Sequence, residues 1–379
     1  MDAKNVLFWY TTRFGELFKL FITGEYVSMI EDKDISIVVQ GPIIYQSTLG
    51  ITENVTQLVC LRLRKVFPQG EIILSTWEGE NTENIEHDQL ILNQDPGGTW
   101  FNYEDYQTLN NCNRMIISTF AGIKAASRKY ILKIRSDLFI VSKKFLDYFE
   151  RFPQYNMEYK FVKNRIICFS LNTLHGHKTS LFIMHRPFHI SDWAYFGYKS
   201  DLFNLYDIPL IKEPGFSQWF LNRCKPFYDI EPWRLWKMPP EQYITYSFLN
   251  KFTPIKLDHT VDTSNNNVEL SSQLLTNNFL ILDQTQFSLI SLKYLYFVFS
   301  SAKGYEWYIF HSDWLKNYCQ LMSHSRLLKT KYIIQYQIRE IVYKTLNRVL
   351  RKLNRKNQKI CRLFAFFLRR ENNKLRDNL

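Results

Sequence analysis

The sequence predicts an α/β protein in which a mostly parallel β-sheet is flanked by helices, with a helical extension at its C-terminal end. Between residues 34 and 150, short β-branched runs alternate with stretches of helical periodicity in the order β-α-β-β-α-β. Short connections join these elements, which is typical of parallel strands linked by crossover helices. Ligands of such sheets bind beyond the carboxyl ends of the strands, so the residues that follow each strand are the first site candidates.

Each element of this region rests on a local signal. Apolar and β-branched runs predict strands at 35–39, 71–74, 89–92 and 130–134. Apolar residues at helical spacing predict helices at 49–66 and 113–126, and Pro68 with Gly70 ends the first of them. The residues after the first and third strands, Gln40-Gly41-Pro42 and Asp95-Pro96-Gly97-Gly98, are typical of turns.

The rest of the chain is less regular. We expect short strands at 165–169 and 179–184 and a helix at 241–249 that follows a proline-rich stretch. Residues 258–278 are rich in Asp, Ser, Thr and Asn, which predicts a surface loop or linker. The predicted division is an N-terminal amphipathic helix (1–30), an α/β domain (31–258), a linker and accessory segment (259–310) and a basic helical tail (311–379).

The net charge of +12 is concentrated at one end of the 379-residue chain. Residues 326–379 hold 16 Lys or Arg against three acids, which leaves 32 bases and 33 acids in the rest. A neutral body offers no groove that tracks phosphates, so we expect no nucleic-acid partner. Apolar residues on one face of the tail helix, opposite Lys and Arg, indicate docking on an anionic membrane surface. Packing of the tail on the body is the alternative.

The chemistry of the compartment is also constrained. Charged residues at 22% and aromatics at 16% exclude a disordered chain. Six scattered cysteines form no C-x-x-C pair, which favours buried thiols in a reducing compartment. No signal peptide pattern and no run of 18 uncharged apolar residues occurs. We therefore expect a cytoplasmic protein that does not span a membrane.

The sharpest site candidate is the strand at 130–134 with the residues that follow it. Asp137 at its carboxyl end could hold Mg²⁺ or Mn²⁺ against a diphosphate, although a helix N-cap or a solvated turn residue has the same pattern. Arg135 could bind a phosphate or form an ion pair near Asp137.

Further candidates lie at turns and helix starts. Gly41 permits close approach of a planar ligand. Asn113 and Arg114 begin a helix, where they could bind a phosphate or only cap the helix. Asp192 lies among aromatic residues that suit a sugar. Glu241 lies in the first turn of a helix, where an acid is also favourable with the helix dipole.

Taken in order, several motifs resemble the WavE lipopolysaccharide-synthesis family, whose members are predicted glycosyltransferases of the GT-A type. The resemblance covers about residues 34–250, and its motifs are 34–42, 64–68, 71–77, 95–97, 113–116, 133–137, 191–193 and 240–243. It implies a nucleotide-sugar donor and a glycan or lipid-linked acceptor. The nucleotide sugar would be bound by Gln40, Gly41, Pro42, Ser75, Trp77, Asp95, Asn113, Arg114 and Arg135.

The resemblance also implies roles in catalysis. The D-x-D signature of GT-A enzymes is matched by Arg135-Ser136-Asp137, which keeps only the final acid, so the predicted Mg²⁺ or Mn²⁺ site rests on Asp137. The base that activates the acceptor would be Asp192 or Glu241, and the aromatic surroundings favour Asp192. The sequence therefore predicts a glycosyltransferase for a bacterial surface polysaccharide, lipopolysaccharide or capsule precursor, located at the inner face of the cell membrane. A non-catalytic glycan-binding protein and a basic nucleic-acid-binding protein are the alternatives.

Overall fold

The computed structural model describes residues 29–45, 54–103, 106–178, 183–223, 235–291, 308–322 and 334. The predicted N-terminal helix, apart from its last two residues, and almost all of the predicted tail after residue 322 lie outside this part of the chain.

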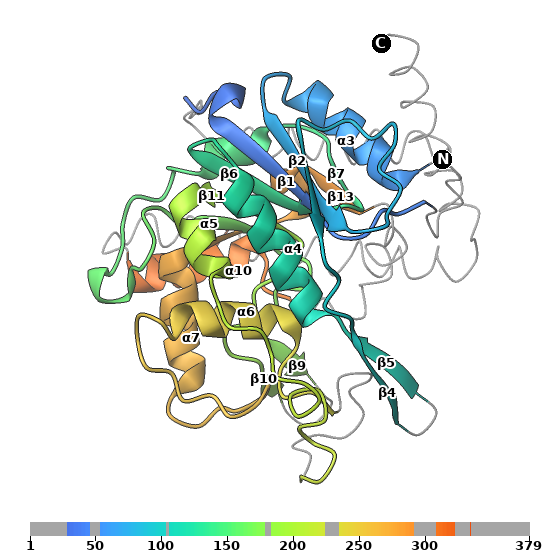
Figure 1. Ribbon diagram of the computed structural model, residues 1–379. Helices are drawn as coiled ribbons and strands as arrows, with labels where there is room; N and C mark the ends of the chain where they lie inside the picture. Colours follow the sequence, from blue (N-terminus) through green and yellow to red (C-terminus); the bar gives the residue numbers. More distant parts are fainter. Residues whose placement is uncertain are drawn as a thin grey trace, which may run out of the picture.

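A seven-stranded sheet forms the centre of the described chain (Figure 1). Its order is β12-β8-β11-β6-β1-β2-β3, and only β11 runs antiparallel to its neighbours in it. The predicted mostly parallel α/β sheet is thereby confirmed. The strands are β1 (Ile35–Gln40), β2 (Glu71–Trp77), β3 (Gln89–Asn93), β6 (Tyr130–Arg135), β8 (Ile166–Phe169), β11 (Ala194–Tyr198) and β12 (Phe279–Leu282).

Helices cover both faces of this sheet. Every residue of β1 and β2 is buried, as expected for central parallel strands that are covered on both sides. Gly122 of α4 (Cys112–Ala125) lies against Val38, whereas Gly70, just after α3 (Val55–Val66), lies against the next residue back, Ile37. Because successive side chains of a strand point to opposite faces, α4 and the turn after α3 lie on opposite sides of β1.

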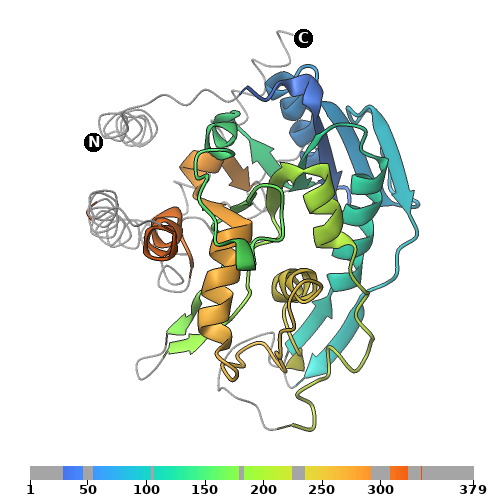
Figure 2. The same cartoon turned by 90° about the vertical axis from the view of Figure 1, so that its left-hand side faces the viewer.

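The elements of the second half of the chain complete the sheet and its cover. They include α5 (Lys199–Tyr206), α6 (Pro240–Leu249), α7 (Asn267–Asn278) and α10 (His311–Leu321). Figure 2 shows α7 and α10, in orange and red-orange, on the side of the molecule away from α4. Short pieces complete the described chain: β7 (Leu138–Ile140) pairs with β13 (Leu289–Ser291), and α8 (Gln284–Phe287) precedes β13.

The structure differs from the sequence prediction in three places. The loop predicted at 258–278 contains α7, and β12 directly after it joins the main sheet, so residues 267–282 are part of the same α/β unit. Where one strand was expected at 179–184, the described residues form two short strands, β9 (Gly176–Lys178) and β10 (Ile183–His185). An unpredicted hairpin, β4 (Thr99–Tyr103) with β5 (Tyr106–Asn110), projects from the body (Figure 1).

The amide-rich composition of α7 explains why it resembles a loop in sequence. Asn277 Oδ1 accepts a hydrogen bond from Asn156 N at 2.8 Å, and Asn278 Oδ1 accepts one from Phe161 N at 2.7 Å. Both asparagines are fully buried. Their amides therefore serve buried backbone groups that would otherwise lack partners, rather than solvent.

A buried arginine joins this half of the molecule. The Arg165 guanidinium donates to three backbone carbonyls: Thr276 O at 2.7 Å, Phe152 O at 2.6 Å and Gln154 O at 2.6 Å. The side chain is 1% exposed and lies 3.9 Å from the centre of the Tyr155 ring. Arg165, which directly precedes β8, thus fixes the end of α7 and the segment before β8.

Glu71 at the start of β2 should make stability depend on acid. Its carboxylate accepts hydrogen bonds from Ser36, from Gln89 and from the backbone and hydroxyl of Ser127. Burial alone would raise the pKa of Glu71, but these hydrogen bonds lower it below its ordinary value. Because the folded protein favours the ionised carboxylate, Glu71 stabilises the fold at pH values above its unfolded-state pKa. This stabilisation is lost as the pH falls through the folded-state pKa.

We therefore expect Glu71→Gln to lower the urea midpoint more at pH 7 than at pH 3.5. Urea unfolding followed by circular dichroism at both pH values measures this difference. The exposed Glu78→Gln, just beyond the other end of β2, is the control. An equal loss at both pH values would show that the charge of Glu71 does not contribute.

Candidate functional site

The candidate site lies where the parallel strands end and the antiparallel β11 begins. Gln40, at the end of β1, pairs in register with Ser75 of β2 and with Arg135 of β6. Ala194, at the start of β11, pairs with Ile134 of β6. This arrangement brings the predicted residues at 40–42, 135–137 and 192 together at the carboxyl ends of the parallel strands.

The loop after β1 is held in one conformation by backbone contacts. Gly41 N donates to Ser75 O at 3.1 Å, and Ser136 N donates to Gln40 O at 2.9 Å. The Ser136 hydroxyl donates to Pro42 O at 2.7 Å. Gly41 has φ +118°, a conformation that residues other than glycine rarely adopt, and a Cβ there would lie 3.3 Å from Ser136 Oγ. Gly41, where the sequence predicts close approach of a ligand, therefore has a backbone conformation that favours glycine.

Gly41→Ala is expected to destabilise the protein by about 1 to 3 kcal/mol through backbone strain. The sequence predicts that this loop binds a nucleotide-sugar donor, and the new methyl group, which presses on Ser136, should weaken that binding. Gly79→Ala is the matched control, because Gly79 has φ +84° and a Cβ there would meet no other atom within 4 Å. Urea unfolding and donor titration of both variants test this. Equal loss of donor affinity in the two would contradict a role for the loop at 40–42.

Arg135 and Asp137 form a partly buried ion pair with each other. Arg135 Nε donates to Asp137 Oδ1 at 3.0 Å and Nη2 donates to Oδ2 at 2.8 Å. The Asp137 side chain is 3% exposed, and the Arg135 guanidinium lies 5.2 Å from the centre of the Trp193 ring. No group of three His, Cys, Asp or Glu residues that could hold a metal ion occurs among the described residues. The Arg135 guanidinium neutralises the Asp137 carboxylate with one hydrogen bond to each oxygen. The metal site predicted at Asp137 stays a prediction.

The two candidate bases lie in one electrostatic neighbourhood with Lys133. Asp192 is 3% exposed, and its backbone carbonyl accepts a hydrogen bond from the Lys133 ammonium. Burial lowers the pKa of Lys133 to about 8. The charge of Arg135 lowers it further, whereas the acids Asp192, Asp137 and Glu241 oppose the shift.

The surroundings of Glu241 change its protonation. Burial, followed by the charge of Asp192, raises the pKa of Glu241 to about 7, whereas Arg135 and a hydrogen bond from Asn172 oppose the rise. A carboxyl group with a pKa near neutrality is suited to general acid or base catalysis. Glu241 also retains more solvent exposure than Asp192.

Two further residues of the site were not predicted. Asn172 contacts Glu241 directly, and Arg186 lies close enough for the two charges to interact. Burial lowers the pKa of Arg186 to about 10, so the guanidinium stays charged at neutral pH. Within the described part of the chain, Arg186 forms no ion pair and its buried Nε has no hydrogen-bond partner. Arg186 directly follows β10 and Asn172 comes three residues after β8, so the rule that site residues follow strands could have found both.

Arg114 and Asn113, by contrast, have partners within the protein. Arg114 pairs with Asp95 through two bonds of 2.7 and 2.6 Å and donates to Asn111 Oδ1 at 2.9 Å. Asn113 exchanges two hydrogen bonds with the backbone of Ile211.

Ser75 and Trp77 at the end of β2 are buried. The Ser75 hydroxyl donates to Ser118 O and accepts from Asn93. The nucleotide-binding roles of these five residues, Ser75, Trp77, Asp95, Asn113 and Arg114, therefore stay predictions.

No helix of the described residues is long and apolar enough to cross a membrane.

Comparisons with known proteins show which family the chain belongs to. No curated protein sequence matches the chain. Among solved structures, 4-diphosphocytidyl-2C-methyl-D-erythritol synthase from Anaerococcus prevotii is similar at 12% identity and a TM-score of 0.30, covering 63% of this chain and 95% of its own. A family model described as WavE lipopolysaccharide synthesis matches residues 35–351, which is most of the chain. The chain therefore belongs to the WavE lipopolysaccharide synthesis family.

Proposed function

We propose that the protein is a glycosyltransferase of the GT-A type that moves a sugar from a nucleotide-sugar donor to a hydroxyl of a lipopolysaccharide precursor. Family membership supports the pathway. The observation that carries the chemistry is the cluster at the sheet edge, where Glu241 and Asp192 lie beside the cations Arg135 and Arg186. One base and a group of cations are the parts that glycosyl transfer requires.

In the proposed mechanism Glu241 is the general base. The carboxylate takes the proton of the acceptor hydroxyl while the acceptor oxygen bonds to the anomeric carbon. The bond from that carbon to the donor phosphate breaks, and the nucleotide leaves with the bonding electron pair. Glu241 suits this role better than Asp192, which the sequence favours, because it is more exposed and has a pKa of about 7. Asp192 acts through Glu241 by raising that pKa.

The proposed donor site stabilises the leaving phosphates with side-chain cations. Arg135 lies next to the rigid loop at 40–42, and Arg186 is a buried cation without an ion pair among the described residues. A buried unpaired charge costs several kcal/mol, which a bound anion would offset.

The decisive test is a screen of nucleotide sugars for binding and slow hydrolysis. We expect one donor to bind, and Arg186→Met to weaken its binding. If no nucleotide sugar binds while the fold is intact by circular dichroism, the proposed function is wrong.

Transfer is expected to survive metal chelation. In the proposed mechanism the side-chain cations Arg135 and Arg186, rather than a divalent cation, stabilise the leaving phosphates. Activity should therefore be the same with and without EDTA. Asp137→Asn should lower activity through misplacement of Arg135, again equally in both conditions. Loss of wild-type activity in EDTA, with recovery on adding Mg²⁺ or Mn²⁺, would instead establish the metal site predicted at Asp137.

We also propose, from the sequence, that the basic segment after residue 325 holds the enzyme at the anionic inner face of the cell membrane. Its 16 basic residues support electrostatic binding of about 1 kcal/mol for each one near the surface. Flotation with anionic and neutral liposomes tests this, and equal recovery from both would contradict it.

A further inference from the structure

A second feature of this half of the molecule is a cavity of about 580 Å³ beside α6. One wall is the segment 209–223, and the other includes Lys237, Met238 and the outer side of α6. The segment is fixed to the start of α4, because Asn113 bonds the backbone of Ile211 and Asn110 Nδ2 donates to Ser217 Oγ at 2.7 Å. The cavity is therefore built into the structure at the same end of the sheet as the candidate site.

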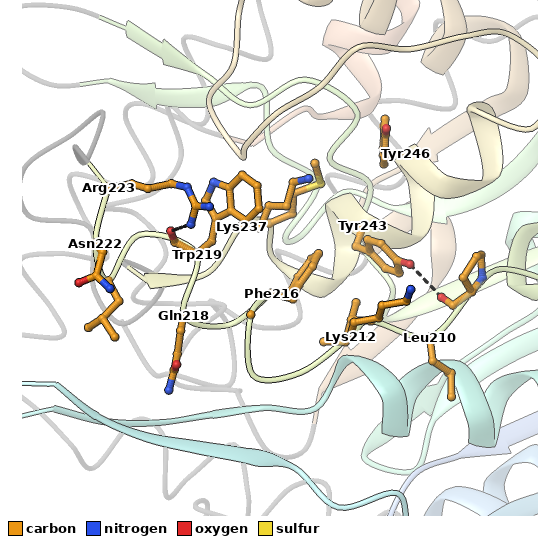
Figure 3. A pocket seen from close by; sticks show the side chains of 15 residues that line it. Leu210, Lys212, Phe216, Gln218, Trp219, Asn222, Arg223, Lys237, Tyr243 and Tyr246 are labelled. Atoms are coloured by element: carbon orange, nitrogen blue, oxygen red, sulfur yellow. Dashed lines mark hydrogen bonds between the residues drawn. The ribbon is translucent and has the colours of Figure 1, made fainter.

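Helix α6 connects this cavity to the proposed base. Glu241 lies in its first turn, and Tyr243 and Tyr246, two and five residues later, line the cavity. The Tyr243 hydroxyl donates to Pro209 O at 2.9 Å, which ties the helix to the opposite wall (Figure 3). A helix turns by about 100° per residue, so both tyrosines lie on the side of α6 away from Glu241, which is not part of the lining. A molecule bound in the cavity would reach Glu241 only by extending past the first turn of the helix.

Aromatic rings form much of the lining. Phe216 and Tyr243 pack edge to face with their centres 5.2 Å apart, and Figure 3 shows Phe216 between Trp219 on one side and Tyr243 on the other. Flat apolar rings at the wall of a polar-rimmed cavity suit the CH faces of a sugar. The volume is within the range of small-molecule sites, about 300 to 1,000 Å³.

The charged residues of the lining are all positive. They are Lys212, Arg223 and Lys237, and no Asp or Glu occurs among the described residues of the lining. Arg223 Cζ and Lys237 Nζ lie 4.0 and 4.4 Å from the centre of the Trp219 ring (Figure 3). Burial and then Arg223 lower the pKa of Lys237, while Asp258 opposes the shift. None of the three cations forms an ion pair within the described residues.

We propose that this cavity, the acceptor pocket, binds an acceptor sugar that carries an anionic group, such as a phosphate monoester or a carboxylate. The rings stack on the sugar, and the cations around Trp219 neutralise the anion, whose own charge relieves their mutual repulsion. The proposal rests on the proposed function and deepens it, because the acceptor would extend from this pocket past the first turn of α6 to Glu241.

Binding measured without any donor tests the pocket by itself. The probes are a phosphorylated disaccharide, the same disaccharide without phosphate, and inorganic phosphate, each titrated by calorimetry into the full chain. We expect the phosphorylated sugar to bind at least about tenfold more tightly than either of the other two, as one well-placed charge contact predicts. A uronic-acid disaccharide shows whether a carboxylate is accepted in place of the phosphate.

Variants locate the site. Lys237→Met and Trp219→Leu should each remove most of the preference for the phosphorylated sugar. Lys124→Met is the matched control, because Lys124 is an exposed lysine 4.3 Å from the Phe120 ring and lies outside the pocket lining. Equal affinity for the neutral and phosphorylated sugars, or unchanged affinity in Lys237→Met, would overturn the proposal. Inorganic phosphate that binds as tightly as the phosphorylated sugar would overturn the sugar part.

The two proposals fail separately. If no nucleotide sugar binds but the phosphorylated disaccharide does, the transferase function is wrong and the pocket stands. If a donor binds but the pocket shows no anion preference, only the acceptor assignment is wrong.

Discussion

Glu241→Gln is expected to lower kcat by about 10² to 10⁴, the usual contribution of a general base. Glutamine keeps the shape of the side chain and can still contact Asn172, so the loss would come from the missing proton acceptor. In the wild type, activity should rise with pH through about 7, the pKa of Glu241, because the base must be deprotonated. Steady-state rates with the donor found in the screen, measured from pH 5 to 9, give both quantities.

Asp192→Asn separates the two acids. Removing the negative charge of Asp192 takes away one of the causes that raise the pKa of Glu241. The rise of activity should therefore move to lower pH, with a smaller loss of kcat than in Glu241→Gln. If Asp192→Asn costs more activity than Glu241→Gln and leaves the pH profile of the remaining activity unmoved, Asp192 is the base, as the aromatic surroundings in the sequence favour.

Arg165→Ala is expected to lower the free energy of unfolding by at least about 3 kcal/mol. The change leaves the carbonyls of Phe152, Gln154 and Thr276 without their donor, and each buried group left unpaired costs about 1 to 3 kcal/mol. Lost packing on Tyr155 adds to this. Urea unfolding followed by tryptophan fluorescence measures the change.

Two variants control this result. Arg128→Ala removes an exposed arginine and should stay within about 0.5 kcal/mol of the wild type. Arg165→Lys keeps the charge but cannot reach three carbonyls at once, so it should lie between the wild type and Arg165→Ala. A stability equal to the wild type in Arg165→Lys would mean that the buried charge, rather than the fork of hydrogen bonds, is what matters.

The central strands were predictable because their burial dictates their composition. β1, β2 and β6 are apolar runs covered on both faces, and such a run has few alternatives to a parallel strand. The position of β11 was not predictable, since it enters between β6 and β8 from a later part of the chain. α7 was missed because asparagine is read as solvated, whereas Asn277 and Asn278 are buried hydrogen-bond partners.

For the candidate site, too, the positions of some residues could be predicted, but their contacts could not. Residues at strand ends and helix starts, such as Asp137 and Glu241, could be found because regular elements fix where they lie. The hydrogen-bond partner of each acid could not be predicted. Arg135 contacts Asp137 and Asn172 contacts Glu241 through side-chain positions that the sequence pattern does not specify. Arg186 directly follows β10, but the strand expected there at 179–184 was not considered as a source of site residues.

The pairing of β8 with β12 also has a consequence for how the protein is made. The two strands are neighbours in the sheet, yet β12 is encoded more than a hundred residues after β8. A ribosome adds about 5 to 20 residues per second, so the edge of β8 waits about 6 to 20 seconds for its partner. An open strand edge is a template for pairing with other chains. The nascent protein therefore passes through an interval in which this edge of β8 is open to pairing with other chains, before β12 covers it.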